Sequence, residues 1–197
     1  MKYLKKFNKE ILFFNKIKKY QIDEICKKYN IKNYTINPDG SIDVDDGVNL
    51  YNYRLAKLPL KFNKVNGYFY CSINELTKLE GSPVEVNGSF YCNSNKLTSF
   101  KYTPKIIRSI FDCRSNNIKT FEYFPRFVKA DFLCDNNPIE EVWKLFKDWT
   151  KIELLNDFDV FRDEDTDEPS IFIERLNDFL ETIGKPTAKK VERYKNI

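Results

Sequence analysis

Four evenly spaced cysteines are the side chains of this chain that most suggest chemistry. Cys71, Cys92, Cys113 and Cys134 stand 21 residues apart, and thiols can ligate zinc, form disulfides or act as nucleophiles. Zinc ligands normally come in close pairs, roughly two to four residues apart, whereas this stagger gives a stacked column. The chain contains no histidine, so catalysis by a cysteine–histidine pair is excluded.

Disulfides between neighbouring cysteines are also disfavoured, because parallel side chains in a packed interior do not offer the required dihedral angle. We therefore interpret the four cysteines as small buried hydrophobic residues, and we interpret Cys26, on a helical apolar face, in the same way. A glycine-rich phosphate loop is missing from the sequence as well. The sequence accordingly predicts no catalytic residue, no metal site and no cofactor.

The cysteines belong to a 21-residue repeat that runs from about Val48 to Pro138. A phenylalanine stands two positions before each cysteine, an asparagine three positions after it, and apolar residues two and five positions after the asparagine. These positions hold Phe69, Phe90, Phe111 and Phe132; Asn74, Asn95, Asn116 and Asn137; Leu76, Leu97, Ile118 and Ile139; Leu79, Phe100, Phe121 and Val142. A period near 20 residues is typical of a solenoid, because each unit is too small to bury its own apolar face.

A degenerate copy precedes the four clear repeats, so we expect about five turns of one coil. This copy consists of Val48, Leu50, Leu55, Leu58 and Val65, with Tyr53 at the asparagine position. Each repeat should begin with a short strand whose Phe and Cys point inward, and stacked strands should form a parallel sheet on the concave side. The asparagine amide should satisfy buried backbone groups, and Pro83, Pro104 and Pro125 favour an extended convex segment.

The pattern Phe-x-Cys-x-x-Asn-x-Leu-x-x-Leu/Phe resembles the leucine-rich repeat, with Phe and Cys at two Leu positions. The segment CSINELTKLEGSPVEVNGSFYCNSNKLTSF shows it clearly. The resemblance covers about half of the chain and is to the short bacterial and phage-type repeats, most of all to small proteins carried by phages and other mobile elements. It implies an α/β leucine-rich repeat solenoid, formed by residues 48–137, and a binding role.

Residues 1–47 are expected to cap the front of this solenoid. Residues 3–30 have helical periodicity and are rich in lysine, which indicates either a solvated face or a patch for nucleic acid or another acidic partner. The turn signal Asn-Pro-Asp-Gly at 37–40 predicts a β-hairpin over 34–44. The nearby Asp43, Asp45 and Asp46 lack the pattern of a calcium loop, so we interpret them as a solvated turn.

Residues 138–184 are expected to form a helical C-terminal cap. A helix should start at Asn137-Pro138 and include Trp143 and Trp149, and a final helix should span Pro169 to Ile183. Residues 185–197 are expected to be a basic, mobile tail. No apolar run of the length of a transmembrane helix exists, no signal peptide is evident, and unpaired cysteines favour the cytoplasm, which would be that of a bacterial host if the chain is phage-encoded.

Outward residues of the concave strands are the natural binding surface, because the core positions are already occupied. Tyr and Arg are enriched at binding hot spots. The candidate site comprises Tyr51, Tyr68, Tyr70, Tyr91, Asn93, Asp112, Arg114, Asp131, Leu133 and Asp135.

Three function classes compete. The first is a non-catalytic module that binds a protein, which the resemblance suggests is a host factor, such as a defence protein that it blocks. The second is a nucleic-acid-binding protein that uses the Lys-rich N-terminal helices and concave Tyr residues. The third, an enzyme, is disfavoured because no histidine and no separate catalytic domain are present.

Overall fold

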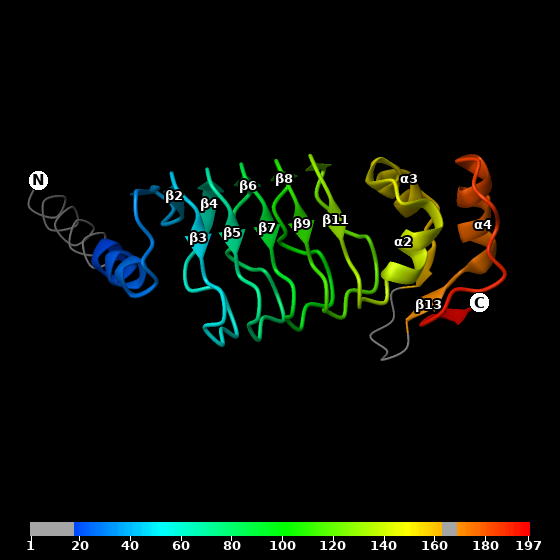
Figure 1. Cartoon of the computed structure of the whole chain (residues 1–197), viewed down its shortest axis with the longest axis horizontal. Helices are drawn as coiled ribbons and strands as arrows, with labels where there is room; N and C mark the ends of the chain where they lie inside the picture. Colours follow the sequence, from blue (N-terminus) through cyan, green and yellow to red (C-terminus); the bar gives the residue numbers. More distant parts are fainter. Residues whose placement is uncertain (1–17, 163–168) are drawn as a thin grey trace, which may run out of the picture.

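Two stacks of short, mainly parallel strands run through the middle of this α/β chain (Figure 1). The computed structural model describes residues 18–162 and 169–197. The first stack is a five-stranded sheet, in which paired residues on neighbouring strands are 21 positions apart in the sequence, as for Phe69 and Phe90. The 21-residue repeat predicted from the sequence therefore sets the register of this sheet. Its strands are β3 (Val48–Asn49), β5 (Phe69–Tyr70), β7 (Phe90–Tyr91), β9 (Phe111–Asp112) and β11 (Phe132–Leu133).

The second stack is a six-stranded sheet, of which the sequence predicted only the hairpin over 34–44 and extended segments within the repeats. The chain enters it after each strand of the first sheet, through the turn that contains the repeated proline. Val86, Ile107 and Val128 point inward from it and are fully buried, and this recurring apolar position is its sequence signal. Its strands are β1 (Tyr34–Ile36), β2 (Ile42–Val44), β4 (Phe62–Val65), β6 (Glu85–Val86), β8 (Ile106–Ile107) and β10 (Phe127–Val128).

The predicted hairpin at the front edge is confirmed, because β1 pairs antiparallel with β2. Gly40 closes its turn by donating a backbone hydrogen bond to the Asn37 carbonyl (2.9 Å) and has φ +82°, a conformation that favours glycine. The remaining strands of this sheet continue from β2 in parallel.

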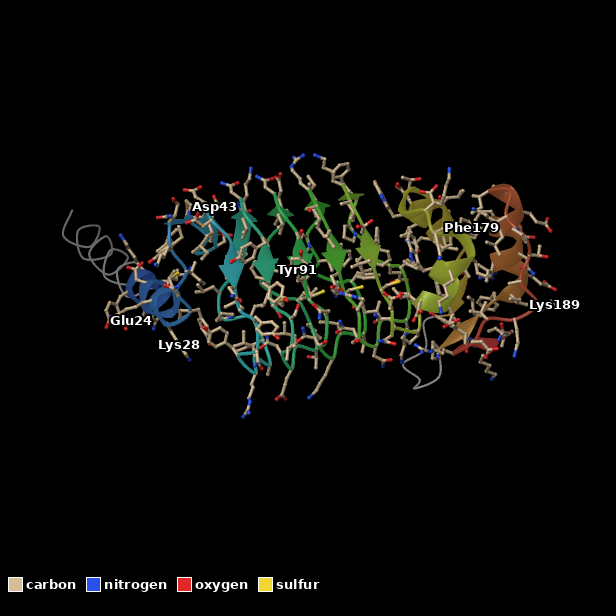
Figure 2. The ribbon with its side chains drawn as sticks, in the orientation of Figure 1. Glu24, Lys28, Asp43, Tyr91, Phe179 and Lys189 are labelled. Carbon is tan, nitrogen blue, oxygen red and sulfur yellow. The ribbon has the colours of Figure 1, made fainter. Side chains whose placement is uncertain are left out.

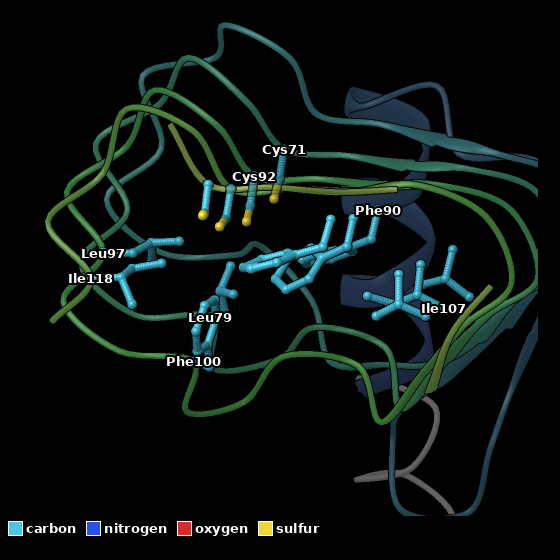
Figure 3. Close-up of a cluster of buried hydrophobic side chains, with 14 of the residues drawn as sticks. Cys71, Leu79, Phe90, Cys92, Leu97, Phe100, Ile107 and Ile118 are labelled. Atoms are coloured by element: carbon cyan, nitrogen blue, oxygen red, sulfur yellow. The ribbon is translucent and has the colours of Figure 1, made fainter. Parts of the chain in front are cut away.

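Between the sheets lie the columns of Phe, Cys and Leu side chains (Figure 3). Phe69 and Phe90 stack with ring centroids 5.6 Å apart, and Phe111 continues the column. All five cysteines are free and buried, as expected. Burial raises the pKa of the Cys92 and Cys113 thiols well above the ordinary value, which keeps these thiols neutral.

The repeated asparagines satisfy the backbone of two successive turns, as predicted. The Asn95 amide donates to the carbonyls of Cys71 and Cys92 (both 3.0 Å), and its oxygen accepts from the Leu76 N–H (3.0 Å). Asn74, Asn116 and Asn137 make the equivalent bonds. The column therefore fixes each turn against its neighbour.

The C-terminal region differs from the prediction of two long helices. Its elements are α2 (Glu140–Phe146), η1 (Trp149–Lys151), α3 (Ile152–Asp157), β12 (Phe161–Arg162), β13 (Ser170–Ile171), α4 (Ile173–Thr182) and β14 (Lys195–Asn196). The first predicted helix ends early because Lys147 takes a left-handed conformation (φ 50°), which leaves Trp149 in a 3₁₀ turn. The final helix begins at Ile173 rather than Pro169, because Ser170 and Ile171 pair with β12 and β14.

The expected mobile tail is instead part of the folded C-terminal region. Its strand β14 pairs in parallel with β13. Val191 and Tyr194 are buried, and the Tyr194 hydroxyl donates a 2.6 Å hydrogen bond to the Lys119 carbonyl. A basic segment at the chain end thus anchors itself to the repeats through two apolar side chains.

At the N-terminal end of the described chain, residues 18–28 form a helix, and its side chains Ile22 and Cys26 are buried. The N-terminal part of the predicted helix, with its lysines, lies outside the described residues. In the part of the chain that the structure describes, none of the helices combines the length and apolar character that crossing a membrane requires.

Candidate functional site

The outward side chains of the five-stranded sheet form three columns, with one residue from each strand. The first column is Gly47, Tyr68, Ser89, Ile110 and Asp131; the second is Asn49, Tyr70, Tyr91, Asp112 and Leu133; the third is Tyr51, Ser72, Asn93, Arg114 and Asp135. Burial alternates as predicted along β3, β5, β7 and β11, but not along β9, where Phe111 and Asp112 are both buried; Ser72 in the third column is buried as well. We call this surface the tyrosine face.

Tyrosines dominate the half of the tyrosine face that lies over β3, β5 and β7. Tyr70 contacts Tyr51 on one side and Tyr91 on the other, with ring centroids 5.2 Å and 4.9 Å apart. Figure 2 labels Tyr91 over the middle of the row of strands. The Tyr68 ring lies over Gly47, where a Cβ would come within 2.7 Å of it. Because the rings support one another, they form a continuous and ordered aromatic surface.

The other half of the tyrosine face, over β9 and β11, is charged. Asp112 is only 2% exposed, and Arg114 binds its carboxylate in two places, from Nε (3.0 Å) and from Nη2 (2.7 Å). These hydrogen bonds raise the pKa of Arg114. Asp131 and Asp135 are exposed, and no side-chain partner is found for either among the described residues. The face therefore ends in two carboxylates that form no hydrogen bond or ion pair within residues 18–162 and 169–197.

The structure places the predicted site residues on one face but gives them different roles. Tyr51, Tyr70 and Tyr91 contact one another, whereas Asp112 is committed to Arg114 below the surface. Asn93 accepts a hydrogen bond from the buried Ser72, so its oxygen is also occupied. Leu133 lies on β11 at one end of the face, whereas Tyr68 lies beside β5, one strand in from the other end. These roles differ in how deeply each side chain is buried and in which side chain it binds, and the repeat pattern predicts neither property.

Two features were missed by the sequence analysis. Tyr53 is exposed and packs edge-to-face on Tyr29, with centroids 5.0 Å apart, which extends the aromatic surface toward the N-terminal helix. A groove of about 650 Å³ lies beside the segments that lead into the strands of the six-stranded sheet. Its lining includes Leu58, Leu60, Val84, Tyr102 and Lys105. The signal for the groove is Val84 and Tyr102, apolar residues outside the repeated core positions.

Within residues 18–162 and 169–197, no cluster of three His, Cys, Asp or Glu side chains has the geometry of a metal site. No family model, curated protein or solved structure matches the chain. We therefore infer function from the geometry of the faces described above.

Proposed function

We propose that this chain is a leucine-rich repeat solenoid of about five turns that binds a protein partner through the tyrosine face. The single observation that supports this most is the contact between Tyr51, Tyr70 and Tyr91. Tyrosines of this kind provide large amphipathic contact area with few rotatable bonds, so ordering them on binding costs little.

The size of the face agrees with such a role. Five strands spaced about 4.8 Å apart span roughly 20 Å, and the flanking turns widen the surface toward the roughly 800 Å² per partner of a standard interface. Tyrosine is among the residues most enriched at hot spots. The aromatic half is therefore the expected centre of the interface.

The charged half specifies the chemistry of the partner. Asp131 and Asp135 are unpaired among the described residues and lie within the same face as the tyrosines. A partner that inserts an apolar side chain between the tyrosines and places Lys or Arg near these carboxylates would satisfy both halves. Tyrosine rings also attract such cations directly.

We assign no reaction to this face, because its outward polar groups are mainly tyrosines, amides, the exposed carboxylates of Asp131 and Asp135, and a closed Asp112–Arg114 pair. The thiols lie on the inner side of the sheet and are kept protonated by burial. The resemblance to phage and mobile-element repeats favours a host protein of the bacterial cytoplasm as the target, such as a defence protein that the chain blocks.

Nucleic acid is the second candidate partner, because bases stack on tyrosines. The electrostatics of the face oppose it. Asp131 and Asp135 would repel phosphates, and the guanidinium of Arg114 is occupied by Asp112. Binding to nucleic acid through this face should therefore be weak and strongly salt-dependent.

The test is affinity capture from host lysate at physiological salt, with half of each sample treated with nuclease. Wild type is compared with the Tyr51→Ala/Tyr70→Ala/Tyr91→Ala variant and with a matched control, Tyr102→Ala/Tyr123→Ala, which removes exposed tyrosines elsewhere. We expect one host protein to be captured by wild type and control but lost from the triple variant, with nuclease having no effect. Capture that survives the triple variant would exclude the tyrosine face, and capture abolished by nuclease would favour the second candidate.

A further inference from the structure

On the outer face of the six-stranded sheet, acidic side chains gather toward one end and basic side chains toward the other. At one end, Asp43 and Asp45, with Asp46 beside them, form an acidic edge at β2; Figure 2 labels Asp43 near the start of the row of strands. At the other end, Lys105, Arg126 and Lys129 form a basic edge at β8 and β10. Phe127 of β10 is exposed on the same face.

The acidic edge keeps its negative charge, because its hydrogen-bond partners are neutral. Asp43 accepts from the Asn63 side chain (2.7 Å) and the Lys64 backbone N–H (3.1 Å). Asp45 accepts from Asn66, and Asp46 accepts from the Asn33 side chain (2.6 Å). Neutral donors hold these carboxylates in place without cancelling their charge.

The basic edge is likewise not neutralised. Lys105, Arg126 and Lys129 are exposed, and none of them forms an ion pair with a described residue. By contrast, Arg108, which also lies on the outer face, pairs with Glu85 at 3.0 Å. The face thus carries about three uncancelled negative charges at one edge and three positive charges at the other.

The symmetry of the sheet relates the two edges. In the strand order β1-β2-β4-β6-β8-β10, β6 lies two strands, or about 10 Å, from both β2 and β10, and β1 lies beyond β2. Consider two copies whose outer faces meet across a twofold axis that runs parallel to β6, between the two sheets. The rotation places β2 of one copy over β10 of the other. Residues that pair across the strands of one sheet stay at the same height along the strands of the other. Such an operation places each acidic edge over the basic edge of the other copy.

We propose that this face binds the same face of a second copy of the chain in a twofold-symmetric dimer. Asp45 then faces Lys129 of the second copy. Glu85 meets its own counterpart on the axis, where Lys64 (3.9 Å) and Arg108 of each copy neutralise it. A polyanion on the basic edge alone would leave the acidic edge unmatched, whereas a second copy satisfies both.

The dimer is expected to be weak and salt-sensitive. The patch is about 20 Å by 10 Å before side chains are counted, which is smaller than a standard interface. Its complementarity is mainly electrostatic, and such contacts are screened within about 10 Å at 0.1 M salt. The tyrosine face stays open in this arrangement, so the dimer does not depend on the function proposed above.

Sedimentation equilibrium of the full chain, from about 10 to 500 µM protein in about 50 mM and about 500 mM salt, tests the proposal. Three charge-reversed variants are compared with wild type: Asp45→Lys/Asp46→Lys at the acidic edge, Arg126→Glu/Lys129→Glu at the basic edge, and the matched control Lys185→Glu/Lys189→Glu, whose lysines are exposed in the C-terminal region. Circular dichroism confirms that each variant is folded.

We expect wild type and the control to dimerise at low salt, with the dimer dissociation constant at least about tenfold higher at high salt. Each edge variant alone should be monomeric, because its two edges carry the same sign. An equimolar mixture of the two edge variants should form a dimer, since all contacts between the two chains are then complementary.

Three results would overturn the proposal. The first is a monomeric wild type at every concentration, and the second is a dimer that survives either edge reversal. The third is a mixture of edge variants that stays monomeric. Binding of a single-stranded oligonucleotide by a monomeric wild type, lost in Arg126→Glu/Lys129→Glu, would assign the basic edge to nucleic acid instead.

Discussion

Two sets of asparagines repeat every 21 residues in this molecule, and their surroundings differ. Asn74, in the turn after β5, makes five hydrogen bonds, all with backbone groups, and is 9% exposed. Asn87, on the outer face of the six-stranded sheet, donates to the Asn66 side chain (2.8 Å) and accepts from Arg108 (3.1 Å). Water can replace the bonds of Asn87 but has little access to those of Asn74. The comparison teaches that the same residue at the same period stabilises the fold only where it satisfies buried backbone.

Replacing the inner asparagine should give the largest effect on stability. Asn74→Ala leaves the amides of Tyr53 and Leu55 and the carbonyls of Leu50 and Cys71 without their side-chain partner, which should lower the free energy of unfolding by about 3 kcal/mol. Asn87→Ala, the matched control, should change it by less than about 0.5 kcal/mol. Urea unfolding followed by circular dichroism measures both. Similar losses for the two variants would contradict the comparison.

Two arginine pairs extend the comparison to charged side chains. Arg114 binds Asp112, whose side chain is 3% exposed, whereas Arg108 binds Glu85, whose side chain is 23% exposed. Arg114→Ala should cost about 1–2 kcal/mol because it isolates a buried carboxylate, although the exposed position of Arg114 itself keeps the loss moderate. Arg108→Ala should cost less than about 0.5 kcal/mol. The same urea experiment ranks them, and a larger loss for Arg108→Ala would reverse the interpretation.

The buried thiols give the prediction that depends on pH. Burial raises the pKa of the Cys92 thiol well above its ordinary value, so the folded chain keeps a proton that the unfolded chain releases above about pH 8.5. The stability from this thiol is fully present below that pH and is lost, at about 1.4 kcal/mol per pH unit, as the pH rises toward the raised pKa. Cys92→Val should reduce the slope of stability against pH between about pH 8.5 and 10 by this amount. An unchanged slope would mean that Cys92 ionises in the folded chain.

Most of the repeat region could be predicted from the sequence, because the 21-residue period indicates which side chains are buried and which residues pair. Phe90 and Cys92 alternate with outward residues, and the strand that they form pairs in the register that the period predicts. Of the six-stranded sheet, only the β1–β2 hairpin was predicted, because a turn signal marks it, whereas the other strands contain little alternation. The positions of Val86 and Ile107 were noted as repeated, but their pairing depends on the stacking of turns.

The C-terminal region was predicted less well because it does not repeat. Trp149 continues the helical spacing of Trp143, yet the left-handed Lys147 between them ends α2. Tyr194 lies in a basic segment with no periodicity, and it is buried only because the repeats offer the Lys119 carbonyl as a partner. The local sequence pattern does not predict such contacts between distant segments.

The sequence by itself determined which side chains face inward, since an apolar residue at every twenty-first position must be buried for such short units to be stable. It thereby also determined that Tyr70, Tyr91 and Asp112 share an outward column. Only the tertiary structure decided that Tyr70 and Tyr91 contact each other at the surface while Asp112 is withdrawn and paired with Arg114. It alone also placed the acidic edge and the basic edge at equal distances from β6. The reason is physical: burial follows from local periodicity, whereas pairing and charge balance depend on which turns become neighbours in space.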